Sequence, residues 1–180
     1  MKSSLLKAII VSLLALLIVG CKKNYSINDK QVVLFQYEYL NYAWGYQHNG
    51  FIIDNEGNVL TYCNPEHWNF PDNDFILDEK QVAENIDCCT PANIKIPVEE
   101  LQKYTSYINN IASSKVTALK NVAADAGSSE FICYTFPENT ETYKGHLIKM
   151  EGDFTCENLN FYSKKITLWM KDIKSRISME

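Results

Sequence analysis

Alternating positions in one segment, and strand-like runs bounded by turn residues elsewhere, mark the strands that this sequence predicts. In residues 31–40, QVVLFQYEYL, aromatic residues occupy every second position from Phe35 to Tyr39, so we expect a strand with one buried face. Residues 55–57, Asn-Glu-Gly, lie between two apolar runs, and the glycine supplies the positive φ that a tight hairpin needs. The predicted strands are residues 31–40, 50–54, 58–63, 130–136 and 143–151.

Apolar positions spaced three or four residues apart predict the helices. An acidic start favours a helix over residues 79–88, and Pro97 followed by two glutamates opens a second helix over 97–113. Residues 159–177 carry an apolar stripe opposite a row of lysines, which is typical of a helix packed on a core. Residues 114–130 are small and weakly patterned, and we expect a mobile loop there.

Together these elements predict one α+β domain over residues 31–180. We expect an antiparallel sheet of about five strands, with two or three helices packed on one side, because no regular βαβ alternation appears. The remaining chain divides into residues 1–20, a signal segment, and residues 21–30, a polar tether of at most roughly 30 Å.

The signal segment is basic at its start, with Lys2 and Lys7, and apolar from Ala8 to Val19, a run too short for a permanent membrane span. Its end, Ile-Val-Gly-Cys at residues 18–21, resembles the lipobox of bacterial lipoproteins. The resemblance implies cleavage before Cys21 and acylation of that cysteine, which would anchor the protein in a lipid bilayer. The alternatives are a plain signal peptide or an uncleaved anchor.

The residues around the cleavage point also bear on localisation in the cell envelope. Lys22 follows the cysteine, whereas this lipoprotein class has Asp there for inner-membrane retention and, in Bacteroidota, acidic residues for surface display. The resemblance therefore favours the periplasmic side of the outer membrane. Loss of residues 1–20 would remove two lysines and no acid, changing the formal charge from −5 to −7. Such an acidic domain does not suggest nucleic-acid binding.

Cysteine content fits an exported protein that can form disulfides. We predict a link between Cys133 and Cys156, which lie in neighbouring predicted strands. Cys63 would pair with Cys88 or with Cys89, because adjacent cysteines bridge each other only with backbone distortion. One of the adjacent pair would remain a free thiol.

Aromatic and amide side chains are concentrated in residues 37–70, in loop-like surroundings. Aromatic faces beside amides can stack on a sugar or grip a peptide, so this stretch is a candidate binding surface for a protein or glycan. The alternative is that the rings fill the core. The candidate binding residues are Tyr42, Trp44, Tyr46, His48 and Trp68.

Motifs for metal, cofactor or catalysis are sparse. Asp72, Asp74 and Asp78 could supply oxygen ligands for calcium, although an acidic loop that caps a helix explains them equally, and we expect no metal. No serine elbow, phosphate-binding glycine loop or dinucleotide fingerprint appears, so we expect no cofactor.

One cysteine and one histidine suggest an enzymatic alternative. The residues around Cys88 and His146 are faintly similar to the cysteine and histidine motifs of NlpC/P60 cell-wall peptidases, and occur in the same order. That resemblance implies a cysteine nucleophile with a histidine base, but Cys89-Thr90-Pro91 follows where the family has small residues and a helix. The favoured expectation is a non-enzymatic binding, inhibitor or immunity-type module.

Overall fold

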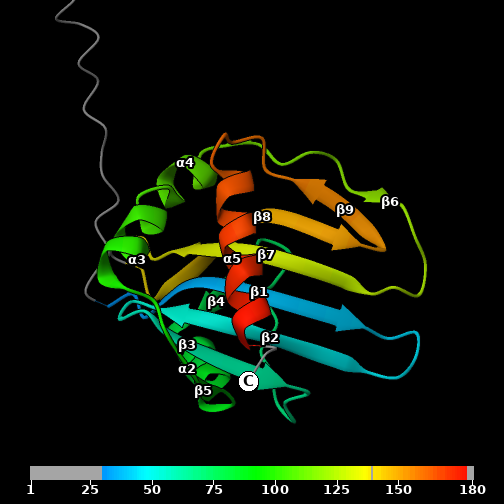
Figure 1. Ribbon diagram of the computed structural model, residues 1–180, viewed down its shortest axis with the longest axis horizontal. Coiled ribbons are helices and arrows are strands. Elements are labelled where there is room, and N and C mark those ends of the chain that lie inside the picture. The colour runs from blue at the N-terminus through cyan, green and yellow to red at the C-terminus, as the bar shows by residue number, and fades with distance from the viewer. Residues whose placement is uncertain (1–29, 139, 178–180) are drawn as a thin grey trace, which may run out of the picture.

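A computed structural model describes residues 30–138 and 140–177. The described chain forms one antiparallel sheet of nine strands in the order β5-β3-β2-β1-β7-β8-β9-β6, with β4 paired to β8 (Figure 1). The strands are β1 (Val33–Asn41), β2 (Gln47–Asp54), β3 (Asn58–Cys63), β4 (Ile76–Asp78), β5 (Thr90–Lys95), β6 (Lys120–Asn121), β7 (Ser128–Thr135), β8 (Thr142–Gly152) and β9 (Phe154–Glu157). The helices are α2 (Glu79–Asp87), α3 (Val98–Thr105), α4 (Ile108–Ala112) and α5 (Ser163–Ile177). The α+β class is confirmed, and the sheet is larger than predicted.

The predicted signal segment, Cys21 and the tether up to residue 29 lie outside the described residues. Within residues 30–138 and 140–177, no helix combines the length and the apolar character needed to cross a membrane.

The predicted hairpin joins β2 to β3. Gly57 has φ +82°, and the Asp54 side chain accepts hydrogen bonds from the backbone N–H groups of Glu56 and Asn58 at 2.9 and 2.8 Å. The turn therefore combines a left-handed glycine with an aspartate that satisfies the turn's backbone donors.

One face of the sheet, here called the α5 face, carries the larger core. Phe35 of β1 packs edge-on against Trp169 of α5, with ring centroids 5.1 Å apart, and Tyr104 of α3 stacks on the same indole at 4.1 Å. Trp169 Nε1 donates to Glu100 Oε1 at 2.6 Å, which satisfies the one polar atom of this buried ring.

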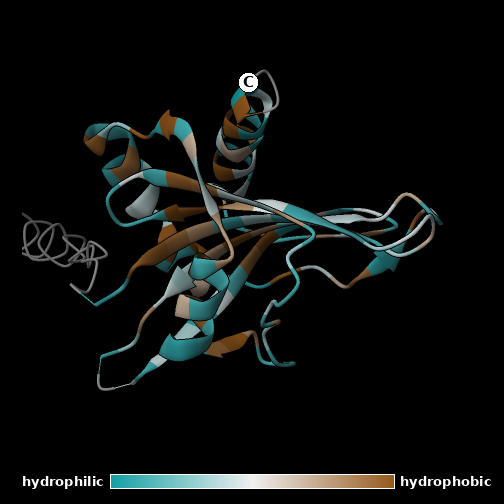
Figure 2. Cartoon of the chain, turned by 90° about the horizontal axis from the view of Figure 1, so that it is seen from below, coloured by the Kyte–Doolittle hydropathy of each residue, from teal (hydrophilic) through white to brown (hydrophobic). Residues whose placement is uncertain are grey.

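The other face, here called the α2 face, corrects the prediction that all helices share one side. Val82 of α2 is buried with Leu77 and Ile132 in a second core cluster, separate from the one beneath α5. Figure 2 shows α5 on one side of the sheet and a helix on the other. Asp78 starts α2 with a capping box to Gln81, directly after β4 has paired with the edge of β8. This pairing places the helix on the second face.

Two predicted helices have different bounds in the structure, and side-chain hydrogen bonds account for both changes. The helix expected over 97–113 is divided into α3 and α4, where Thr105 Oγ1 and Ser106 Oγ donate to the carbonyls of Leu101 and Lys103. Helix α5 begins at Ser163 and not at residue 159, because Asn158 and Asn160 side chains accept N–H groups two residues ahead.

The sheet extends past its helices at one end (Figure 2). We call residues 40–47, 125–130 and 150–154 the open end; they include the β1–β2 connection and the neighbouring ends of β7 and β8. Residue 30, where the described chain begins, leads directly into the opposite end of β1.

Candidate functional site

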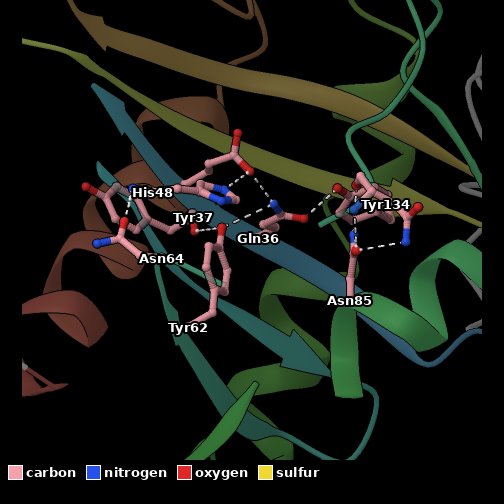
Figure 3. Close-up of polar contacts among 9 residues, drawn as sticks. Gln36, Tyr37, His48, Tyr62, Asn64, Asn85 and Tyr134 are labelled. Atoms are coloured by element: carbon pink, nitrogen blue, oxygen red, sulfur yellow. Dashed lines mark hydrogen bonds and ion pairs between the residues drawn. The ribbon is translucent and has the colours of Figure 1, made fainter. Parts of the chain in front are cut away.

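A chain of hydrogen-bonded polar side chains crosses the α2 face of the sheet (Figure 3). Tyr134 Oη donates to Gln36 Oε1 at 2.7 Å, and Gln36 Nε2 donates to Glu38 Oε2 at 3.0 Å. His48 Nε2 lies 3.1 Å from the same Glu38 oxygen, and Tyr62 Oη lies 3.4 Å from Gln36 Nε2. Buried polar groups cost free energy unless they are bonded, so these contacts are a condition for placing polar residues in the middle of the sheet.

The imidazole of His48 forms the centre of this site. It is fully buried, and its ring lies 5.0–6.1 Å from four aromatic rings. These rings belong to Tyr46, Tyr62, Trp68 and Phe70. Nδ1 of the imidazole has no hydrogen-bond partner among the described residues. An acid–base pair is therefore enclosed on several sides by aromatic groups.

Paired asparagines hold the loop that covers His48. Asn64, at φ +47°, accepts the His48 backbone N–H through its side chain at 2.7 Å and donates its own N–H to the His48 carbonyl at 2.7 Å. Asn85 of α2 accepts the N–H of Asn69 at 2.7 Å and donates to its carbonyl at 2.8 Å. These bonds fix both sides of Trp68, so its position over His48 follows from backbone anchoring.

The structure brings together four of the five predicted binding residues. Tyr42 and Tyr46 lie with ring centroids 5.6 Å apart, Tyr46 and His48 6.1 Å apart, and His48 and Trp68 5.2 Å apart. This series, here called the aromatic row, runs from an exposed turn to the buried imidazole. Trp44 is 77% exposed and has no recorded ring contact within the described chain. The rings are thus partly core and partly surface.

Sequence reasoning missed the polar members of the site that lie on β1. Gln36 and Glu38 are buried polar residues in a strand whose alternate positions are aromatic. That alternation was visible in the sequence, but it predicted solvent exposure for the polar positions. Other side chains on the α2 face cover them instead. Such coverage cannot be inferred from the sequence of the strand alone.

Glu130 lies beside Glu38, because the two residues are direct partners in the β1–β7 ladder. Burial, with a smaller effect of the Glu38 charge, raises the pKa of Glu130 from 4.5 to about 7. Its carboxylate has no recorded hydrogen bond or ion pair within the described residues. A partly buried acid without a partner is a costly feature, and such features concentrate at functional sites.

The structure does not bring Cys88 and His146 together. Cys88 Sγ, at the end of α2, donates to the His67 carbonyl at 3.2 Å. His146 Nε2 lies 2.9 Å from Thr135 Oγ1, and its ladder partner Cys133 belongs to the core of the opposite, α5 face. Burial, assisted by Lys144, lowers the pKa of His146 to about 4. This geometry provides no nucleophile–base contact for the hydrolase alternative.

All five cysteines in the described part of the chain are free thiols. Cys133 lies in the α5-face core and Cys156 in the α2-face cluster, so the structure does not bring this predicted pair together. Cys63 and Cys88 are exposed, and Cys89 is partly buried. A link from Cys63 to Cys88 or Cys89 stays a prediction.

The aspartates considered for calcium have structural roles. Asp72 Oδ1 accepts the N–H groups of Asp74 and Ile76 at 2.8 and 2.9 Å, and Asp78 caps α2. Among the described residues, no group of three His, Cys, Asp or Glu side chains is arranged to hold a metal ion.

The site thus combines flat aromatic surface with a buried acid–base pair and an unpaired carboxylate. Aromatic faces supply contact area at a low entropic cost, and buried charges select for complementary groups. Comparison of the chain with protein-family models, curated proteins and solved structures finds no match.

Proposed function

We propose that this protein is a lipid-anchored lipoprotein of the bacterial cell envelope that acts as a non-enzymatic binding module, of a ligand-binding, inhibitor or immunity type. In this proposal the acylated Cys21 holds the chain in the outer membrane, facing the periplasm. The aromatic row and the exposed turn beside it bind a protein or glycan.

The relative positions of the start of the described chain and the exposed turn support this proposal. Strand β1 starts three residues after the first described residue and ends at Asn41, immediately before the exposed turn. A nine-residue strand spans roughly 30 Å, so the start of the described chain and the exposed turn lie at opposite ends of β1. A protein held by its N-terminus would present the aromatic row away from the membrane.

The observation that carries the binding function is the exposure of aromatic rings at one end of a continuous cluster. Tyr42, Trp44 and Tyr46 are 67%, 77% and 45% exposed, within one five-residue turn. Large rings that are anchored at one side and exposed at the other are typical of interaction surfaces.

The anchor is tested by labelling with a fatty-acid analogue. Cys21→Ser should abolish the label and either release the protein or leave its precursor uncut, because acylation requires the thiol. Unchanged acyl labelling in the variant would refute the lipoprotein assignment.

The binding function is tested by affinity capture from intact envelopes, with full-length protein as bait. Trp44→Ala and Tyr46→Ala should each weaken a captured partner by about 2 kcal/mol, since aromatic anchors dominate interfaces. Phe161→Ala is the matched control, because this ring is 78% exposed, just before α5 and outside the aromatic row. Equal loss in all three variants, or in none, contradicts the proposed surface.

A further inference from the structure

A cavity of about 500 Å³ lies at the open end of the sheet, next to the aromatic row. Its size is within the range of small-ligand sites in proteins. Leu40, Leu119, Met150 and Phe154 provide apolar lining, and Tyr42 joins the cavity to the aromatic row. Leu119 and Phe154 are 57% and 40% exposed, so apolar side chains remain open to solvent here.

Every charged group that lines this cavity is acidic. The carboxylates belong to Asp125, Glu130 and Asp153, and among the described residues no lysine, arginine or histidine lines the cavity. Asp153 is engaged, because it accepts the N–H groups of Ala126 and Gly127 at 2.9 and 3.0 Å. The carboxylates of Asp125 and Glu130 have no recorded partner within the described chain, so two acceptors remain available.

We propose that this cavity binds a lysine side chain of a polypeptide partner, with its ammonium group on Glu130 and its aliphatic stem along Leu40 and Met150. This inference rests on the proposed binding function and specifies one chemical group that the partner must present. Lysine fits because its methylene stem packs on apolar surface while its head needs an anionic acceptor. A net negative domain charge adds long-range attraction for a basic partner.

The electrostatics of Glu130 agree with this assignment. Its ionised form is disfavoured by burial and by Glu38, and a cation at the carboxylate counteracts both effects. The other titratable groups that face it are Tyr134 on its own strand and Cys156 on β9. None of these groups supplies a positive charge, so in this proposal the lysine of the partner provides the cation.

Titration of the full chain in detergent micelles, followed by NMR of ¹³C-labelled methionine methyl groups, tests the proposal. The probe is a blocked tripeptide, acetyl-Gly-Lys-Gly-amide, and its neutral control has norleucine in place of lysine. The Met150 methyl signal should shift to saturation with the lysine peptide and not with the norleucine peptide. The Met170 signal, from the core beneath α5, should stay unchanged. Equal shifts with both peptides would reduce the site to a non-selective apolar cavity and overturn the proposal.

Variants identify the carboxylate that binds the ammonium group. Glu130→Gln should weaken the lysine peptide at least tenfold at pH 8, because a charge-assisted hydrogen bond is lost. Glu99→Gln removes the same charge from the exposed first turn of α3 and should leave the affinity unchanged. Lowering the pH from 8 to 5.5 should weaken binding to wild type several-fold and leave Glu130→Gln unaffected. An unaltered affinity in Glu130→Gln overturns the assignment.

One further outcome distinguishes a polypeptide ligand from a small free amine. Another distinguishes failure of this inference from failure of the proposed function. If pentylamine shifts Met150 but the blocked peptide does not, the site takes a small free amine, and the polypeptide assignment is wrong. If Trp44→Ala still loses an envelope partner while no lysine probe binds, the proposed function stands and this inference fails. Neither Trp44 nor Tyr46 lines the cavity, so the two experiments report on different residues.

Discussion

Successive residues of the same strands point to opposite faces of the sheet, yet the side chains on the two faces differ in polarity. On the α5 face, the buried positions of β1, β2 and β7 are apolar, and α5 seals them. On the α2 face, the intervening positions include Gln36, Glu38 and His48, joined by hydrogen bonds and only partly covered by one short helix and a loop.

In the proposed function, the α5 face supplies stability and the α2 face takes part in recognition. Apolar burial beneath α5 supplies the larger hydrophobic contribution to folding, at about 25 cal/mol per Å² of buried apolar area. Buried polar pairs such as His48–Glu38 are often no more stabilising than apolar residues of the same volume. The proposed function accounts for their presence on the less covered face, and the following predictions test that contrast.

The largest expected effect is loss of a core ring on the α5 face. Trp169→Ala should lower the free energy of unfolding by about 3–5 kcal/mol, because it leaves a cavity between Phe35 and Tyr104. The neighbouring Leu168→Ala is the control: this residue is 57% exposed and should change stability by about 0.5 kcal/mol or less. Urea denaturation measures both. Similar losses in the two variants would contradict the packing described for α5.

Breaking the buried pair on the α2 face should have the next largest effect. Glu38→Leu should cost about 3 kcal/mol, because it leaves the His48 and Gln36 nitrogens buried without their acceptor. Glu38→Gln keeps an acceptor oxygen and should cost about 1 kcal/mol. The difference between the unfolding free energies of the two variants separates the contribution of the hydrogen bonds from that of packing. A leucine variant as stable as wild type would show that the polar chain contributes nothing to stability.

A smaller effect, dependent on pH, is expected at Glu130. Its folded-state pKa, raised to about 7, exceeds the unfolded value of 4.5, so the folded form holds its proton more tightly. The associated stability is fully present below pH 4.5 and is lost as the pH rises through 7. Glu130→Gln should therefore be more stable than wild type at pH 8, by about 1–3 kcal/mol, and equal to it below pH 4.5. A constant difference across pH 4–8 would rule out this linkage.

Other groups also titrate in this range, and the difference between variant and wild type removes their contribution. The lowered pKa of His146, about 4, reduces stability as the pH falls below 6.5, which is the opposite trend. Glu38, Asp125 and Asp153 are common to both proteins. Thermal melts at matched ionic strength, paired at each pH, therefore report on Glu130.

The smallest effect on stability is expected at the exposed turn. Trp44→Ala should change the free energy of unfolding by about 0.5 kcal/mol or less, because its ring is 77% exposed. Trp68→Ala should cost more than 1 kcal/mol, since its ring lies 4.1 Å from that of Tyr62. Thermal melts of the two variants distinguish an exposed ring of the turn from a packed ring of the aromatic row. A large loss at Trp44 would place that ring in the core.

Local sequence determined the regular elements and the turns. Period-two alternation located β1, strand-like runs bounded by turn residues located β2, β3, β7 and β8, and the Asn-Glu-Gly turn located the hairpin. These signals depend on neighbouring residues. The acidic start of α2 likewise appears as a capping box. The four missed strands, β4, β5, β6 and β9, are two to six residues long. Segments this short become strands through pairing with an existing edge and carry little pattern of their own.

Tertiary structure alone decided which side chains share a site. Aromatic composition predicted Tyr42, Tyr46, His48 and Trp68 as a group, but neither the covering loop nor the acidic partner Glu38 could be inferred from it. Glu130 lies beside Glu38 only because strand β7 pairs with β1, which brings together two residues that are 92 positions apart in the sequence. The placement of α2 on the second face followed from β4 pairing with β8, a long-range contact. Register and coverage of a sheet depend on contacts between distant segments, so the pattern within one strand cannot specify them.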